Sequence, residues 1–138
     1  MSLLLDTNVC ISLLNASSEP VRRRYEQLLI DGDPILVPSV VVFELWFGVA
    51  RSAKSFANAA RLRDFLSSGI EVLPFTEQDS IEAGRIRETL HRSKQPIGPY
   101  DTLIAGQALA RNLTLVTAYT REFARVEGIQ WQDWTSTP

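Results

Sequence analysis

The feature that most constrains the fold is a short apolar stretch that ends in a carboxylate. Residues 3–5 are three consecutive leucines, and Asp6 follows them directly. Adjacent leucines are typical of a strand buried on both faces in the middle of a parallel sheet. Thr7, Asn8 and an apolar stretch over residues 9–14 then predict a polar turn followed by a helix. Because ligands of open α/β sheets bind beyond the carboxyl ends of the strands, the sequence predicts Asp6 at such an edge.

Strand and helix signals alternate along the rest of the chain. Strands are predicted over residues 35–37, 70–73, 113–117 and 129–131, the last of these at an edge of the sheet. Helices are predicted over residues 7–15, 19–30, 39–51, 55–67, 77–93, 101–111 and 121–123. Ser39 and Thr76 are predicted N-caps, residues 76–79 resemble a capping box, and residues 95–100 form a shaped loop. This alternation predicts one α/β domain over residues 1–138, with a parallel sheet, flanking helices and right-handed crossovers.

Composition excludes several classes of protein. A net charge of −2 argues against a surface that binds nucleic acid everywhere, so a polyanion would be held by local arginines or a metal. Cys10 is the one cysteine, which excludes an intrachain disulfide, favours a reducing compartment and suits a core position. No basic leader region precedes the first strand, and no apolar run reaches the ~18 residues of a membrane span. We therefore expect a cytoplasmic protein without a membrane partner.

Three acids lie in segments from which other charges are missing. Charged residues make up 22% of the chain, so a window of 16 to 18 residues should hold between three and four. Three windows hold a single charge each, and it is always an acid: residues 1–18 with Asp6, residues 34–50 with Glu44 and residues 95–110 with Asp101. A lone carboxylate in an apolar segment is costly unless it is paired, hydrogen-bonded or bound to a metal. Each acid alone could cap a helix or pair with a distant arginine, but the set favours a shared site.

The helix around Glu44 is apolar on nearly every side. Its neighbours include Val41, Phe43, Leu45 and Trp46, and a helix of this kind is buried in the core or against another subunit. The tryptophans and Phe47 have the same two explanations, because large aromatic side chains serve a core or an exposed contact surface equally well. The sequence leaves this choice open.

A shared site of three carboxylates suits a hard divalent cation. Clustered carboxylates repel one another unless a cation neutralises them, and a set of oxygen ligands favours Mg²⁺ or Mn²⁺. A zinc site is disfavoured, because the chain has one histidine, His91, and one cysteine. A cation held in this way can activate water and stabilise charge at a phosphodiester, with Glu44 orienting or deprotonating that water. Arg85, Arg87, Arg92 and Lys94 are candidates for phosphate contacts.

Other chemistries lack their motifs. The chain contains no G-x-x-x-x-G-K-[ST] loop, no G-x-G-x-x-G and no G-x-S-x-G. Asp6 has no second aspartate two residues later, which disfavours a phosphatase that forms an aspartyl-phosphate. A phosphoacceptor receiver domain of similar size is disfavoured as well, because it needs a paired acidic motif after the first strand and a lysine near the last.

The ordered motifs of this chain resemble the PIN-domain family, and within it the VapC-type toxins of bacterial toxin–antitoxin pairs. The motifs are Leu-Leu-Asp-Thr-Asn-Val at residues 4–9, Phe-Glu-Leu at 43–45, Pro-Ile-Gly-Pro-Tyr-Asp-Thr-Leu-Ile-Ala at 96–105, Leu-Val-Thr at 115–117, Thr-Arg-Glu-Phe-Ala-Arg-Val-Glu-Gly-Ile at 120–129 and Trp-Gln-Asp-Trp at 131–134. The resemblance covers nearly the whole chain, and it rests on the order and spacing of the set.

The resemblance implies a fold, an activity and partners. The fold is a five-stranded parallel sheet in the order 3-2-1-4-5, and the activity is a Mg²⁺- or Mn²⁺-dependent ribonuclease that cuts RNA such as tRNA or ribosomal RNA. Such toxins form homodimers and are inhibited by a small antitoxin of the VapB type, through which alone they contact operator DNA. By motif, Asp6, Glu44 and Asp101 fall on the family's acidic positions, which are both catalytic and metal-binding.

One segment departs from the family's pattern. After the fourth strand the family carries Asn or Asp, whereas this chain has Thr117, Ala118 and Tyr119. The fourth ligand position, aligned with Tyr119, thus has neither a carboxylate nor an amide, although Thr117 could donate a hydrogen bond. This departure motivates an alternative, in which the chain is a PIN-like binding module with weak catalysis or none.

Overall fold

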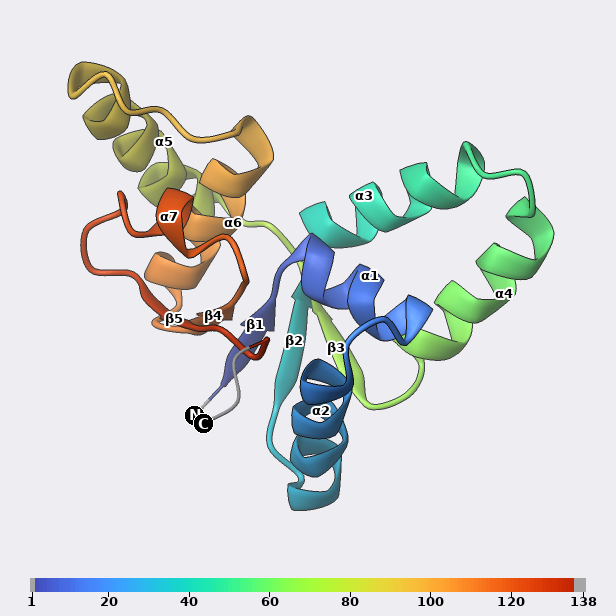
Figure 1. Cartoon of the computed structure of the whole chain (residues 1–138). Coiled ribbons are helices and arrows are strands. Elements are labelled where there is room, and N and C mark those ends of the chain that lie inside the picture. The colour runs from blue at the N-terminus through green and yellow to red at the C-terminus, as the bar shows by residue number, and fades with distance from the viewer. Residues whose placement is uncertain (1, 136–138) are drawn as a thin grey trace.

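The computed structural model describes residues 2–135, which form a five-stranded parallel sheet covered by helices (Figure 1). The strands are β1 (Leu3–Leu5), β2 (Ile35–Pro38), β3 (Ile70–Leu73), β4 (Thr114–Val116) and β5 (Gln130–Gln132). Their order across the sheet is β3-β2-β1-β4-β5, with every neighbouring pair parallel. The predicted order is therefore confirmed, and β5 is an edge strand as expected.

β1 lies at the centre of the sheet because it has no polar face. Leu4 and Leu5 are fully buried and Leu3 is nearly so. Leu4 pairs with Leu36 of β2 on one side and with Leu115 of β4 on the other. A strand that is apolar on both faces is stable only where helices cover both. This central position fixes where the next residue, Asp6, lies.

Seven helices surround the sheet within the described residues. They are α1 (Thr7–Asn15), α2 (Glu19–Asp31), α3 (Ser39–Ala50), α4 (Ser55–Leu66), α5 (Glu77–Arg92), α6 (Pro99–Ala110) and α7 (Thr120–Phe123). Figure 1 shows α5, α6 and α7 gathered on the side of β4 and β5, and α1 to α4 on the side of β2 and β3. None of these helices is both long and apolar enough to cross a membrane. The carboxyl end of β1 opens between the two groups.

Two helix starts differ from prediction. Ser39 is the first residue of α3 rather than its N-cap: Pro38 takes the cap position, without a side-chain hydrogen bond. α6 begins at Pro99, two residues before the predicted Asp101, since the fixed φ of proline suits the first helical position. The prediction at α5 is confirmed, because Thr76 and Asp79 form a capping box. The earlier start of α6 places Asp101 in its first turn instead of at its boundary.

α3 is apolar but only half buried. Val41 and Leu45 face the core, whereas the side chains of Phe43 and Phe47 are 54% and 57% exposed. The core therefore does not account for the whole apolar character of this helix, part of which is exposed. Of the tryptophans, Trp134 is fully buried in the core and Trp131 is partly exposed.

Candidate functional site

Asp6 lies at the junction of β1 and α1, where it is the N-cap of the helix. Its carboxylate accepts a hydrogen bond of 2.9 Å from the Val9 backbone N–H, and its side chain is almost fully buried. The Thr117 hydroxyl, at the end of the neighbouring strand β4, is also hydrogen-bonded to Asp6. Two adjacent parallel strands thus bring Asp6 and Thr117 together at one sheet edge, as the parallel topology requires.

The surroundings of Asp6 oppose its ionisation. Burial is the largest cause that raises its pKa from 3.8 to about 6, and the negative charges of Asp101 and Glu44 act in the same direction. The hydrogen bonds from Thr117 and Val9 act against these effects and favour the carboxylate. Because the charges of Glu44 and Asp101 both raise the pKa of Asp6, both carboxylates lie within electrostatic range of it.

Glu44 projects from α3 toward the start of α1. Its Oε1 accepts a hydrogen bond of 2.7 Å from the hydroxyl of Thr7, the residue after Asp6. The contact joins residues 37 positions apart in the sequence. A hydroxyl that donates to a carboxylate restricts the rotamer of the acid, so Thr7 fixes the position of Glu44 beside Asp6.

Asp101 lies in the first turn of α6. Burial is the main cause that raises its pKa, followed by the charges of Glu44 and Glu122. Asp101 is therefore coupled to the α3 acid as well as to Asp6. The structure brings the three predicted acids to the same edge of the sheet from three different elements.

Glu122 is a further acid at this site that the sequence analysis missed. It lies on α7 and is close enough to Asp101 to raise the pKa of that carboxyl. Scarcity of charge does not single out Glu122, because Arg121, Arg125 and Glu127 are nearby in the sequence. The sequence did contain one indication of Glu122: α7 follows the end of β4 after only a few residues, so it lies at the same edge of the sheet as Asp6.

The segment after β4 is held by its backbone. Thr117 is fully buried, and its Oγ1 accepts a hydrogen bond of 2.9 Å from the Tyr119 backbone N–H. The Tyr119 side chain is 48% exposed. Thr117 thus links the backbone of the turn to the Asp6 carboxylate, while the aromatic ring of Tyr119 faces solvent.

Among residues 2–135, no basic side chain forms an ion pair with Asp6, Glu44, Asp101 or Glu122. Within the same residues, no three acids, histidines or cysteines stand close enough together to hold a metal ion on their own. Mg²⁺ commonly takes one or two carboxylates and keeps several waters. These oxygen-only acids fit a cation of this kind and do not form a closed cage of protein ligands.

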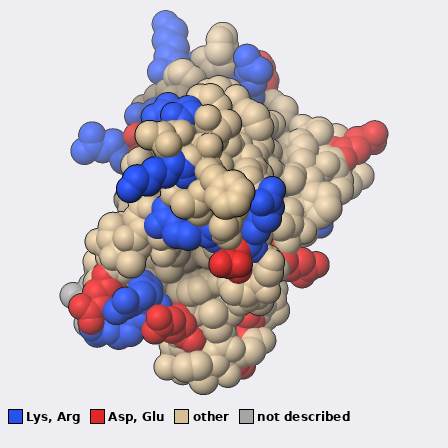
Figure 2. Space-filling model, turned by 90° about the vertical axis from the view of Figure 1, so that its right-hand side faces the viewer, with Lys and Arg blue, Asp and Glu red and all other residues tan. Residues whose placement is uncertain are grey.

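A groove with basic walls adjoins Glu44. The cavity has a volume of about 270 Å³ and is lined by α1, α3 and α4, with Glu44, Arg51, Asn58 and Arg61 among its residues. Figure 2 shows Lys and Arg side chains gathered on the side of the molecule that carries α3 and α4. The groove therefore combines one site acid with two cations, a combination that suits an anionic chain.

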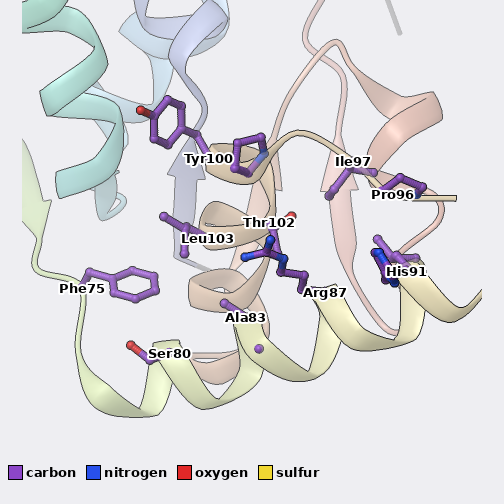
Figure 3. A pocket seen from close by; sticks show the side chains of 13 residues that line it. Phe75, Ser80, Ala83, Arg87, His91, Pro96, Ile97, Tyr100, Thr102 and Leu103 are labelled. Carbon is purple, nitrogen blue, oxygen red and sulfur yellow. The ribbon is translucent and has the colours of Figure 1, made fainter. Parts of the chain in front are cut away.

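The four predicted phosphate contacts are placed differently. Arg85 and Arg92 form ion pairs with acids on their own helix, Glu82 and Glu88. Arg87 projects from α5 into a larger cavity of about 560 Å³ between α5 and the start of α6 (Figure 3). None of these three lines the groove beside Glu44, and neither does Lys94.

Comparison with known proteins identifies the relatives of this chain. A family model described as PIN domain matches residues 3–129. The tRNA(fMet)-specific endonuclease VapC of Salmonella typhimurium is 37% identical over 134 residues, which cover 97% of this chain and 98% of that protein. Ribonuclease VapC2 of Rickettsia felis is 34% identical, with 97% and 98% covered.

Solved structures agree with these relatives. The structure of VapBC2 from Rickettsia felis bound to a DNA fragment from their promoter superposes with a TM-score of 0.90 at 33% identity, and the match covers 97% of this chain and 99% of that one. The structure of DNA-bound VapBC from Salmonella typhimurium gives a TM-score of 0.89 at 36% identity, with 97% and 98% covered.

Proposed function

Since this chain belongs to the PIN-domain family and its relatives are VapC ribonucleases, we propose that it is an endoribonuclease toxin that depends on a divalent cation. The observation that carries the proposal is the electrostatic coupling of Asp6 with Glu44 and Asp101, without a basic partner among the described residues. Carboxylates that repel one another in this way are stabilised by a shared cation. A cation held in this way can promote hydrolysis of a phosphodiester, and the ribonuclease names of the relatives point to RNA as the substrate.

Mg²⁺ or Mn²⁺ is the proposed ion: Asp6 and Asp101 would bind it directly or through water, and Glu44 would complete the site. When bound, the ion would supply Lewis-acid stabilisation of the phosphate and a more acidic water. Glu122 provides a fourth carboxylate beside Asp101, at the side of the site where the sequence lacks the family's Asn or Asp. This position compensates for the missing ligand at Tyr119.

The protein's own groups would orient the reaction. The Thr7 hydroxyl holds Glu44 by a 2.7 Å hydrogen bond, which leaves the second oxygen of Glu44 to accept a proton from the attacking water. Thr117 and the Val9 N–H favour the ionised form of Asp6. We propose Asp6, Glu44 and Asp101 as catalytic residues and Thr117 as a positioning residue.

RNA cleavage by the purified protein tests this proposal. We expect cleavage in Mg²⁺ or Mn²⁺ that EDTA abolishes and that Asp6→Asn lowers by at least about 100-fold, the scale of a lost transition-state contact. Asp64→Asn, at an exposed acid on α4, is the matched control and should keep full activity. Equal trace activity in the wild type and in Asp6→Asn would contradict the proposal.

The partner we propose is a VapB-like antitoxin. The VapBC structures reported above, from Rickettsia felis and Salmonella typhimurium, are toxin–antitoxin complexes bound to DNA. The groove of Glu44, Arg51 and Arg61 offers a cationic surface next to the proposed site, where an antitoxin segment would block the approach of RNA. Co-purification with the product of an adjacent small gene, followed by loss of RNA cleavage, is the expected result.

A second candidate function is a binding module with weak catalysis or none. Ala118 and Tyr119 favour it, because neither can serve as the family's polar ligand. It predicts tight binding of the antitoxin and no cleavage with any divalent ion. Activity that requires Glu122 would rule out this alternative.

A further inference from the structure

The turn between β4 and α7 places an exposed aromatic ring beside the acids. Tyr119 follows Thr117 by two residues and precedes Glu122 by three. Thr117 is hydrogen-bonded to Asp6, and Glu122 acts electrostatically on Asp101. Tyr119 is therefore bracketed by two residues that each reach an acid of the proposed site.

The backbone of Tyr119 is fixed, but its ring is not used by the fold. Its N–H donates to Thr117 Oγ1 at 2.9 Å, and its carbonyl accepts from the Phe123 N–H at 3.3 Å. The ring, by contrast, makes no hydrogen bond and no aromatic contact with any residue in 2–135, and its side chain is 48% exposed. The backbone of Tyr119 is therefore held in place, and its ring is accessible to a group outside the chain.

A basic residue lies nearby in the sequence, on α7. Arg121 lies two residues after Tyr119, is exposed, and forms no ion pair within the part of the chain that the structure describes. An exposed aromatic ring together with a free guanidinium matches the two parts of a nucleotide, its base and its phosphate. An acidic peptide would use the guanidinium alone, so the pair favours a nucleic acid.

We propose that Tyr119 stacks on an unpaired base of the RNA next to the scissile phosphodiester, and that Arg121 binds a neighbouring phosphate. The proposal rests on the proposed ribonuclease function and assigns two residues, Tyr119 and Arg121, to contacts with its RNA. A base inside a duplex has both faces covered, whereas a base in a loop or end can stack on an aromatic side chain. The residue that departs from the family's pattern thus becomes a substrate-binding residue.

Binding of fluorescent RNA tests this proposal without requiring cleavage. The probe is a 12-nucleotide single-stranded RNA with 2-aminopurine at one position in turn, and the protein carries Asp6→Asn to prevent turnover. We expect quenching of 2-aminopurine at one or two positions, retained in Tyr119→Phe and lost in Tyr119→Ala and Tyr119→Asn. The loss of one stacked base should weaken binding about 5- to 100-fold. Arg121→Gln should weaken binding without abolishing the quenching.

Controls separate stacking from other roles. Phe56→Ala removes a side chain that is 92% exposed on α4, and it should leave both affinity and quenching unchanged. The same RNA annealed to its complement should bind weakly and show no dependence on Tyr119. Quenching of 2-aminopurine in Tyr119→Ala equal to that in the wild type would overturn the proposal. A loss of quenching in Tyr119→Phe as large as in Tyr119→Ala would also overturn it, because it would assign the role to the hydroxyl. Failure of the wild type to cleave RNA would instead count against the ribonuclease function.

Discussion

At the scale of single residues, Asp6 shows how the site destabilises the protein that carries it. Burial and the neighbouring acids raise its pKa from 3.8 to about 6. The folded protein therefore binds a proton more tightly than the unfolded chain, so the free energy of unfolding falls as pH rises from about 4 to about 6 and stays low above that range. The charge is retained although it is costly, which is typical of a functional site.

The first prediction concerns Asp6→Asn in EDTA. Asparagine caps a helix as well as aspartate does, but it carries no charge, so the variant should be more stable than the wild type at pH 7.5 by about 1–3 kcal/mol, the scale of a two-unit pKa shift. Thermal unfolding between pH 4 and pH 8 measures this difference, which should vanish near pH 4. Saturating Mg²⁺ should raise the Tm of the wild type more than that of the variant. A variant that is less stable at pH 7.5 in EDTA would contradict this account.

The second prediction concerns the hydrogen bond from Thr7 to Glu44. Thr7→Val removes the 2.7 Å bond and leaves the size of the side chain nearly unchanged, whereas Thr7→Ser retains the hydroxyl. A hydrogen bond to a charged group contributes about 1.5–3 kcal/mol, so kcat should fall by about 10-fold or more in Thr7→Val and little in Thr7→Ser. Single-turnover RNA cleavage at saturating Mg²⁺ measures the effect. Similar rates in the two variants would show that Thr7 does not position Glu44.

At the scale of elements, α5 packs closely against α6, the helix that carries Asp101. A Cβ atom on Gly106 of α6 would lie 2.6 Å from the Cβ of Ala83 on α5 and 2.7 Å from its Cα and N. The helices can approach this closely only because residue 106 lacks a side chain. The position of Asp101, one turn and a half earlier on α6, depends on this contact.

The third prediction compares two glycines across that contact. Gly106→Ala should lower the free energy of unfolding by about 1–3 kcal/mol, because α5 backbone atoms must move. Gly84→Ala, on α5 with no atom within 4 Å of the added Cβ, should raise it by up to about 1 kcal/mol through helix propensity. Urea unfolding measures both variants. A neutral Gly106→Ala would mean that the two helices can separate freely.

At the scale of the whole molecule, α3 presents aromatic side chains that the monomer does not bury. Phe43 and Phe47 are four residues apart on one face of the helix, and both are more than half exposed. Phe43 also packs edge-on against Tyr100 of α6, with ring centroids 5.6 Å apart. This exposed aromatic face supports the homodimer that the resemblance implies, as a contact surface between two copies.

The fourth prediction tests this face. Phe47→Asp should shift the protein from dimer to monomer at micromolar concentration, because burying an unpaired carboxylate in an apolar interface is costly. Its fold should persist, since the side chain is 57% exposed in the monomer. Ile30→Asp, at a side chain 78% exposed on α2, is the matched control and should remain dimeric. Sedimentation velocity distinguishes the two, and a dimeric Phe47→Asp would move the interface elsewhere.

The sequence pattern by itself determined the α/β class, most element bounds and the position of Asp6, whereas the strand order was an expectation from the family resemblance. Three leucines without a polar face favour a central strand, and the residue after a central parallel strand is expected at the ligand-binding edge. Periodicity did not predict that Pro99 belongs to α6 rather than to the preceding loop. It also did not predict that α3 is only half buried. Both depend on what packs against each element.

Only the tertiary structure showed that Glu122 acts on Asp101 and that Thr7 holds Glu44. Scarcity of charge detects an acid only where its sequence neighbours are apolar, and Glu122 follows an arginine directly. Hydrogen bonds and electrostatic interactions act through space over a few ångströms, whatever the distance along the chain. The packing of strands and helices therefore decides which side chains share the site. The sequence pattern identifies only those site residues whose immediate sequence neighbours are apolar.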